Sequence, residues 1–214
     1  GFMSNDGVLW ISTENSKLLY RVDPFHKSIF SIPTVNWALS FLEDREGYLW
    51  VGTGGSGLLK FDQHKNLAQQ FKYERSDLLI PNDNVVACII QTRGDTILVG
   101  TGNGVRIFNK VTQQFYRFHD NGNLNDSTQV GWSKIFQDKQ GLLWFGRFGL
   151  GLVRYNPEDN SFKHFLPDAK DSSSIRSGLV NSILEDRSDV FWVAGIGGIN
   201  RLNREADRFK HYVK

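Results

Sequence analysis

Four residues in one part of the chain have side chains suited to binding sugars or acids. They are Trp132, Lys134, Arg147 and Phe148. An aromatic ring offers a flat apolar platform for a sugar ring, and lysine and arginine can pair with the carboxylate of an acidic sugar. Because residues 132 and 134 alternate along one predicted strand, we expect both side chains on the same side of it. Together with Trp37, at the start of an equivalent strand, they form a predicted ligand-binding site.

These residues depart from a pattern that the rest of the chain keeps. The equivalent positions carry mostly small residues: Ala38, Val86 and Val180 for position 132, Ser40, Cys88 and Ser182 for 134, and Thr13, Thr53, Thr101 and Gly195 for 147. The alternative interpretation is that Lys134 and Arg147 fill a wide channel or pair with Glu43 or Glu185. Mutation of Trp132 or Arg147 separates the two.

The sequence gives little indication of catalysis, and we predict no catalytic residue, no metal site and no cofactor. Three of the five histidines, His119, His164 and His211, fall in or just after predicted outer strands, where a solvated face is the ordinary role. The glycine-rich turn 54–57 is not followed by a helix, so it is read as a hairpin turn and not as a phosphate loop. The single cysteine, Cys88, lies in an apolar run and is expected to be buried and inert.

A repeat positions these residues. An acidic residue, a glycine turn, an aromatic–aliphatic run and a second glycine turn recur five times, and residues Trp10, Trp50, Leu98, Trp144 and Trp192 are 40, 48, 46 and 48 positions apart. Periods of roughly 40 to 50 residues with period-two alternation indicate propeller blades. The sequence predicts an all-β fold, a partial β-propeller of about five blades of four antiparallel strands. The blades are expected at about 1–35, 36–83, 84–129, 130–177 and 178–214, within one propeller segment.

The third repeat shows the expected strands most clearly. Val85–Ile90 is an apolar innermost strand, Ile97–Thr101 and Val105–Phe108 follow, and Gln114–Phe118 alternates as an outer edge strand. The first repeat starts at its second strand, so we expect its blade to lack the innermost one.

The polar residues of the turns have expected structural roles too. We expect the acidic residues Asp6, Asp44, Asp138 and Asp186 to accept local backbone N–H groups in Asx-type turns. Because a partial ring exposes apolar blade faces, we also expect self-association.

Charge and hydropathy exclude some partners. The net charge is +2, and lysine and arginine are scattered, so we predict no nucleic-acid partner. No apolar run approaches the roughly 20 residues that span a bilayer, and there is no signal peptide. The start Gly1-Phe2-Met3 is unlike a native N-terminus, so we expect a segment of a longer protein.

The motif Asp-x-x-Gly-x-Leu-Trp-x-Gly-Thr, followed by Gly-Leu and a strand ending in Phe/Tyr-Asp/Asn, resembles the two-component regulator propeller repeat. Residues 44–62 and 138–156 carry it best, and looser copies cover the rest of the chain. The connector 174–186 resembles that family's blade junction.

The resemblance implies the periplasmic sensor region of a hybrid two-component histidine kinase of Bacteroides type, which responds to breakdown products of complex polysaccharides. Its partners would be an oligosaccharide-like ligand and the remaining blades and kinase modules of the parent chain, and the segment itself would not be an enzyme. The short repeat count leaves open whether a complete ligand site is present.

Two alternatives remain open. Residues 7–13 and 19–23 also look like the repeat of virginiamycin B lyase-type propellers, which would require a divalent cation and a catalytic histidine in the central cleft. The other alternative is a propeller that binds proteins and no small molecule.

Overall fold

The structure is a computed structural model that describes residues 1–13, 17–34, 36–62, 64, 66–73, 84–92, 94–118, 132–147, 149 and 151–212. At positions 132, 133 and 147 the description covers the backbone only. Within these residues the chain forms two compact units, one of residues 1–102 and 106–117 and one of residues 103–105 and 118–214.

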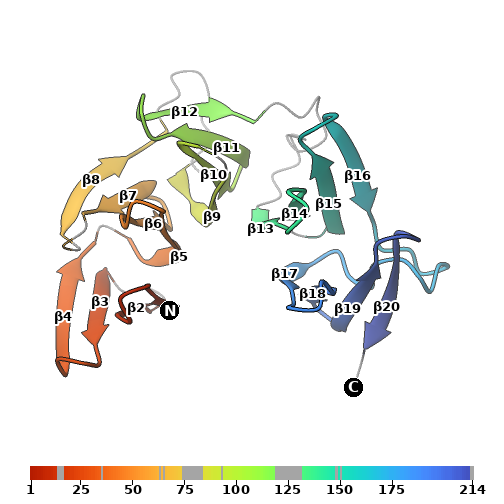
Figure 1. Ribbon diagram of the computed structural model, residues 1–214, viewed down its shortest axis with the longest axis horizontal. Helices are drawn as coiled ribbons and strands as arrows, with labels where there is room; N and C mark the ends of the chain where they lie inside the picture. Colours follow the sequence, from red (N-terminus) through yellow and green to blue (C-terminus); the bar gives the residue numbers. More distant parts are fainter. Residues whose placement is uncertain are drawn as a thin grey trace. The chain divides into compact units, whose positions relative to one another are not determined.

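The described residues form five four-stranded antiparallel sheets, in each of which strands consecutive in sequence pair (Figure 1). The prediction of an all-β propeller fold is confirmed. Each sheet is one blade: β1 (Phe2–Met3), β2 (Leu9–Ser12), β3 (Leu18–Asp23), β4 (Ser28–Pro33); β5 (Ala38–Glu43), β6 (Leu49–Thr53), β7 (Leu58–Phe61), β8 (Leu67–Phe71); β9 (Val86–Gln91), β10 (Thr96–Thr101), β11 (Gly104–Asn109), β12 (Gln114–Arg117); β13 (Trp132–Gln137), β14 (Leu143–Arg147), β15 (Gly151–Asn156), β16 (Ser161–Phe165); β17 (Val180–Glu185), β18 (Phe191–Gly195), β19 (Gly198–Asn203), β20 (Arg208–Tyr212). The described part of the chain contains no helix able to cross a bilayer.

The first blade does have an innermost strand, contrary to the prediction. Strand β1 is only two residues long, and Phe2 and Met3 pair with Trp10 and Leu9 of β2. Phe2 also stacks on Phe41 of the second blade, with ring centroids 5.9 Å apart. Two residues are too few to show a strand pattern in sequence, which is why the prediction missed it.

Neighbouring blades within each unit are held together by apolar layers. One layer lies between the first and second blades around Trp10 and Phe61, and another between the second and third around Trp50 and Phe108. In the second unit the fourth and fifth blades pack around Trp144. All three tryptophans are at most 1% exposed. Burial of side chains of this size contributes on the order of 2–3 kcal/mol each, so these layers are the main force between blades.

All four predicted turn residues accept local backbone N–H groups, as expected of Asx-type turns. The Oδ1 atom of Asp44 accepts the N–H groups of Glu46 and Tyr48 at 3.1 and 2.9 Å. Asp138 and Asp186 make the same pair of hydrogen bonds in their own turns. The three carboxylates also do something that was not predicted: Oδ2 accepts the indole N–H of the tryptophan six residues later, at 2.7–2.9 Å.

In the first blade the residue equivalent to Asp44 is Ser4, whereas Asp6, two residues further along the same turn, accepts a local backbone N–H as predicted. Ser4 N donates to Val8 O and Gly7 N donates to Ser4 O, the pattern that Asp44 makes with its own turn. Asp6 occupies the turn itself, where Oδ1 accepts from Ser4 Oγ and Val8 N. A serine is too short to reach the ring of Trp10, and the Trp10 indole N–H is buried with no acceptor in the part of the chain described.

Candidate functional site

The fourth blade contains four of the five predicted ligand-binding residues, and its backbone confirms that the positions compared in sequence are equivalent. Trp132 pairs with Arg147 across β13 and β14. The matching pairs in the other blades join position 38 to 53, 86 to 101, and 180 to 195. The two largest departures from the repeat, Trp132 and Arg147, are therefore direct cross-strand partners at one end of the blade.

A β-bulge interrupts the innermost strand at this end. Trp132 pairs with Arg147, but Lys134 pairs with Gly146, so two steps along β13 match one step along β14. The same shift occurs between Ala38 and Ser40 in the second blade, and the third and fifth blades have it too. A bulge breaks the strict alternation of a strand. The argument that placed residues 132 and 134 on one side of β13 therefore loses its basis.

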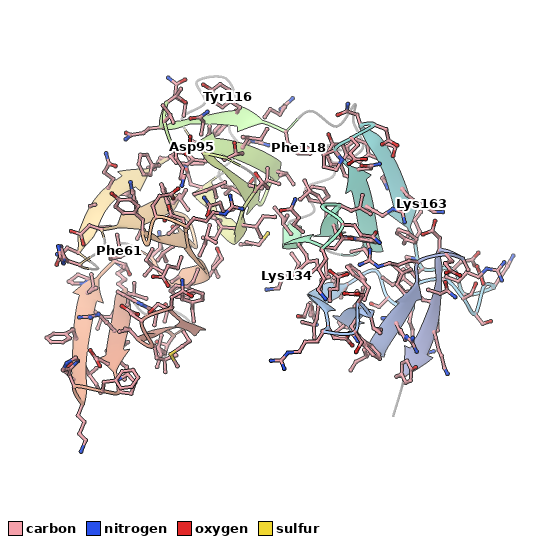
Figure 2. All side chains as sticks on the ribbon, viewed as in Figure 1. Phe61, Asp95, Tyr116, Phe118, Lys134 and Lys163 are labelled. Carbon is pink, nitrogen blue, oxygen red and sulfur yellow. The ribbon has the colours of Figure 1, made fainter. Side chains whose placement is uncertain are left out.

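Lys134 is exposed and lies near the start of β13 (Figure 2). Its cross-strand partner is a glycine, and the second blade shows why. A Cβ at the equivalent Gly52 would come within 2.2 Å of Ser40 Oγ and 2.6 Å of Val86 O. Glycine at this position lets the innermost strand of the next blade approach, and Ser40 Oγ donates to Val86 O at 3.2 Å. The motif glycine is thus a packing residue.

Arginine at position 147 replaces a threonine that closes a turn elsewhere. In the second blade Thr53 is fully buried, its hydroxyl donates to Gly57 O at 2.8 Å, and it accepts the N–H of Ser56 at 2.9 Å. An arginine side chain has donors only and cannot accept that N–H. Arg147 therefore cannot make the pair of hydrogen bonds that Thr53 makes.

Trp37 is half-buried and has a structural role in the second blade. A Cβ added at Gly54 would lie 2.5 Å from the ring of Trp37, so the ring lies directly against that glycine. In the sequence of the fourth repeat, glycine (Gly131) stands at the position of Trp37 and phenylalanine (Phe148) at the position of Gly54. Phe148, like the side chains of Trp132 and Arg147, lies outside the described residues. Trp37 belongs to the first unit and Lys134 to the second.

The two carboxylates offered as alternative partners for Lys134 and Arg147 have other partners. Glu43 Oε2 accepts the N–H of Asn5 from the preceding blade at 2.6 Å. Glu185 accepts from Lys139 N at 2.7 Å and pairs with Arg204 at 2.7 Å. Both therefore join neighbouring blades.

The described histidines do not form a reactive cluster. His164 and His211 lie on the outer strands β16 and β20, as predicted, and His119 lies outside the described residues. His26 pairs with Asp23 at 2.8 Å, and hydrogen bonds from His26 hold the pKa of the Asp23 carboxyl below its usual value. In the described ranges no three His, Cys, Asp or Glu side chains are grouped to hold a metal. Cys88 is buried, as predicted.

Two concave regions of the second unit are formed entirely by described residues. One, of about 540 Å³, lies beside β18 and β19 and includes Arg201, Asn203 and Lys210. The other, of about 710 Å³, lies under the connector between the fourth and fifth blades and includes Asp168, Asp171 and His211. Lys134 lines neither, so neither is the predicted site.

Comparison with known proteins agrees with this architecture. The family model described as "Two component regulator propeller" matches residues 31–55, which end at the glycine turn of the second blade. The chain carries the two-component regulator propeller repeat. A curated protein of Formosa agariphila, histidine kinase P4, is 32% identical over 163 residues, which is 75% of this chain and 12% of that protein.

Solved structures share the propeller fold. The extracellular domains of two putative hybrid two-component systems of B. thetaiotaomicron match with TM-scores of 0.75 and 0.76, at 17% and 18% identity. Each comparison covers 98% of this chain, and 26% or 29% of the other. A chain of the mitotic checkpoint complex also matches, with TM-score 0.66, 13% identity, and coverage of 96% and 60%. At these identities the likeness establishes the fold.

Proposed function

We propose that this chain is part of the extracytoplasmic, periplasmic sensor region of a hybrid two-component histidine kinase, and that it recognises a carbohydrate breakdown product. The repeat and the similarity to a histidine kinase of Formosa agariphila support the sensor assignment. The chain spans about an eighth of that relative's length, so the kinase activity belongs to the proposal for the parent protein. The segment itself acts by binding and not by catalysis.

The observation that carries the ligand assignment is the pairing of Trp132 with Arg147. Every other blade with a matched pair at this point has small residues: Ala38 with Thr53, Val86 with Thr101, and Val180 with Gly195. The Thr53 hydroxyl closes its own turn, so a change to arginine gives up a structural hydrogen bond. An aromatic residue and a cation joined at one point suit a sugar ring that carries a carboxylate.

Reversion to the residues of the sibling blades tests the proposal. The variants W132V, K134S and R147T give the fourth blade the residues that the chain already uses at Val180, Ser182 and Thr53. Digalacturonate serves as an acidic probe and cellobiose as a neutral one. At ten times its dissociation constant a native-state ligand stabilises by about 1.4 kcal/mol, which raises the melting temperature of a chain of this size by about 3–5 °C.

The expected result is a rise with digalacturonate for the unchanged chain and for K170S, a control in the exposed connector. R147T and W132V should lose that rise while keeping the melting temperature of the ligand-free protein. An equal rise in R147T and the unchanged chain would refute the assigned residues. A rise with cellobiose alone, insensitive to R147T, would refute the acidic-sugar assignment.

A further inference from the structure

The contact between the fourth and fifth blades has an asymmetric design. The fourth blade presents the sheet face that bears Trp144, called here the receiving face. The fifth blade covers it with apolar side chains and with the turn 204–207 between β19 and β20, called here the covering turn. Both blades belong to the second unit.

The first charged element of this contact is a cation from the covering turn. Arg204 Nη1 donates to Asp138 Oδ2 at 2.7 Å, and Asp138 is the carboxylate that holds the Trp144 indole. The second and third blades use the same arrangement, because Lys110 Nζ lies 3.3 Å from Asp44 Oδ2. A cation at the first position of the covering turn therefore binds the turn aspartate of the preceding blade.

The second charged element is a carboxylate three residues later. Asp207 bridges Arg154 at 2.8 Å and Lys163 at 2.6 Å, two cations that are cross-strand partners on β15 and β16. In the third blade Gln113 takes this position and reaches Gln69 of the second blade only at 3.5 Å. Gln113 and Asp207 share a positive φ, 57° and 51°, which confirms that they are equivalent.

The apolar element lies between the two. Leu152 is fully buried and Phe165 is 6% exposed, because Phe191 and Phe209 of the fifth blade pack against this region. The ring centroids of Phe165 and Phe209 are 5.5 Å apart.

The fifth blade repeats the receiving face element by element. Its turn aspartate, Asp186, binds the Trp192 indole at 2.9 Å. Its cation pair is Arg201 and Lys210, which are cross-strand partners, both exposed, and line the 540 Å³ concavity. The apolar residues of this face are exposed, whereas their equivalents in the fourth blade are buried. Ile199 is 47% exposed and its equivalent Leu152 is 0% exposed; Tyr212 is 40% exposed and its equivalent Phe165 is 6% exposed. Leu184 on the same blade is 57% exposed.

We propose that the receiving face of the fifth blade is a docking surface for a further propeller blade whose covering turn carries a cation and, three residues later, a carboxylate. The cation would bind Asp186, the carboxylate would bridge Arg201 and Lys210, and apolar side chains would cover Ile199 and Tyr212. Charge complementarity of this kind fixes register and excludes wrong partners. The surface thus selects its partner by the sign and spacing of two charges.

The charges argue against a second copy that docks through its first blade. The covering turn of the first blade lies between β3 and β4, and Lys27, with φ of 49°, takes the position of Asp207. Pro24 takes the position of Arg204. A lysine facing Arg201 and Lys210 is repulsive, and proline supplies no charge for Asp186.

A chain extended by its own fifth blade tests the proposal. Residues 166–212 are duplicated directly after Tyr212, so the duplicated covering turn has the fitting arginine and aspartate. Ile199→Cys in the original blade reports on the face through its maleimide reaction, since Cys88 is buried and the duplicated segment has no cysteine. Val111→Cys, at a site 72% exposed in the first unit, is the control.

The reaction of the cysteine at 199 should slow at least about tenfold in the extended chain, because thiol reactivity follows access. The control at 111 should not change. In the extended chain, reversal of the cation pair by R201E with K210E should restore the fast reaction. When lysine then also replaces the duplicated copy of Asp207, the reaction should slow again. An unchanged rate, or an extension that stays unfolded, would overturn the docking surface. Protection that ignores both charge reversals would overturn the charge selection.

Discussion

Asp138→Ser is the sharpest test of how the repeat motif stabilises the propeller. Asp138 is buried, and its Oδ1 accepts two N–H groups of its own turn. Its Oδ2 accepts the Trp144 indole and Arg204, both at 2.7 Å. Serine is the residue that the chain itself uses at position 4, where the turn forms and the indole of Trp10 has no described acceptor.

The loss of unfolding free energy in Asp138→Ser is set by the hydrogen-bond donors that lose their acceptor. Trp144 is fully buried, so its indole N–H loses its acceptor without gaining water, which costs about 1–3 kcal/mol. Arg204 keeps Glu185 and Gln140 as partners, so the loss of its ion pair with Asp138 adds little to the cost. We expect a total loss of unfolding free energy of about 2–3 kcal/mol, or a melting temperature lower by about 4–12 °C.

Urea denaturation followed by far-ultraviolet circular dichroism measures this loss. Asp186→Ser is the matched control, because Trp192 is only half-buried and its indole can turn to water, so its loss should be smaller. In a Trp144→Phe background, Asp138→Ser should cost about 1–2 kcal/mol less than in the unchanged chain, since no indole remains to orphan. Equal losses for the two aspartates, or additivity with Trp144→Phe, would refute the reasoning.

The turn carboxylates also predict a pH dependence. Burial raises the pKa of Asp44, but hydrogen bonds from Trp50 and its turn outweigh this, and the pKa of Asp186 is lowered chiefly by Trp192. Both carboxyl groups have pKa values below the ordinary 3.8, so the stability they contribute is present above about pH 4 and is lost as the pH falls further. Unfolding free energy measured as a function of pH tests this. A loss of stability that begins near pH 6 would contradict the prediction. Gly52→Ala should cost more than Gly141→Ala, because its Cβ meets backbone whereas Gly141 has only the strain of φ 88°, roughly 1–2 kcal/mol. Denaturant midpoints compare the two, and equal losses would argue against close approach of the blades at this glycine.

The fold was predictable from local patterns, since each blade is a meander of neighbouring strands. The strands of the third blade follow the predicted ranges within one or two residues, because hairpin turns and alternation are encoded over a few residues. The turn of the first blade was aligned on Asp6, which accepts a local N–H as predicted but is not the residue equivalent to Asp44. The six-residue spacing from aspartate to tryptophan at 44–50, 138–144 and 186–192 points to Ser4 for Trp10 and could have corrected it.

The bulges and the contacts between blades could not be predicted in this way. The extra residue of β13 is Ser133, with no glycine to signal it, and it changes the placement of Lys134 relative to Trp132. The ion pair of Arg204 with Asp138 joins residues 66 positions apart and appears only when two blades are packed. Such pairs depend on three-dimensional register, which the period alone does not define.

The binding of digalacturonate to the unchanged chain and to R147T, measured by isothermal titration calorimetry, tests the proposed ligand site most directly. We predict measurable binding to the unchanged chain and a loss of at least about tenfold in affinity for R147T, since one charged pair is worth about 1.4 kcal/mol or more when it is shielded from water. The melting temperature of ligand-free R147T should match that of the unchanged chain. Equal affinity for both proteins would contradict a ligand role for Arg147. The unusual residues of the fourth blade would then be explained by packing.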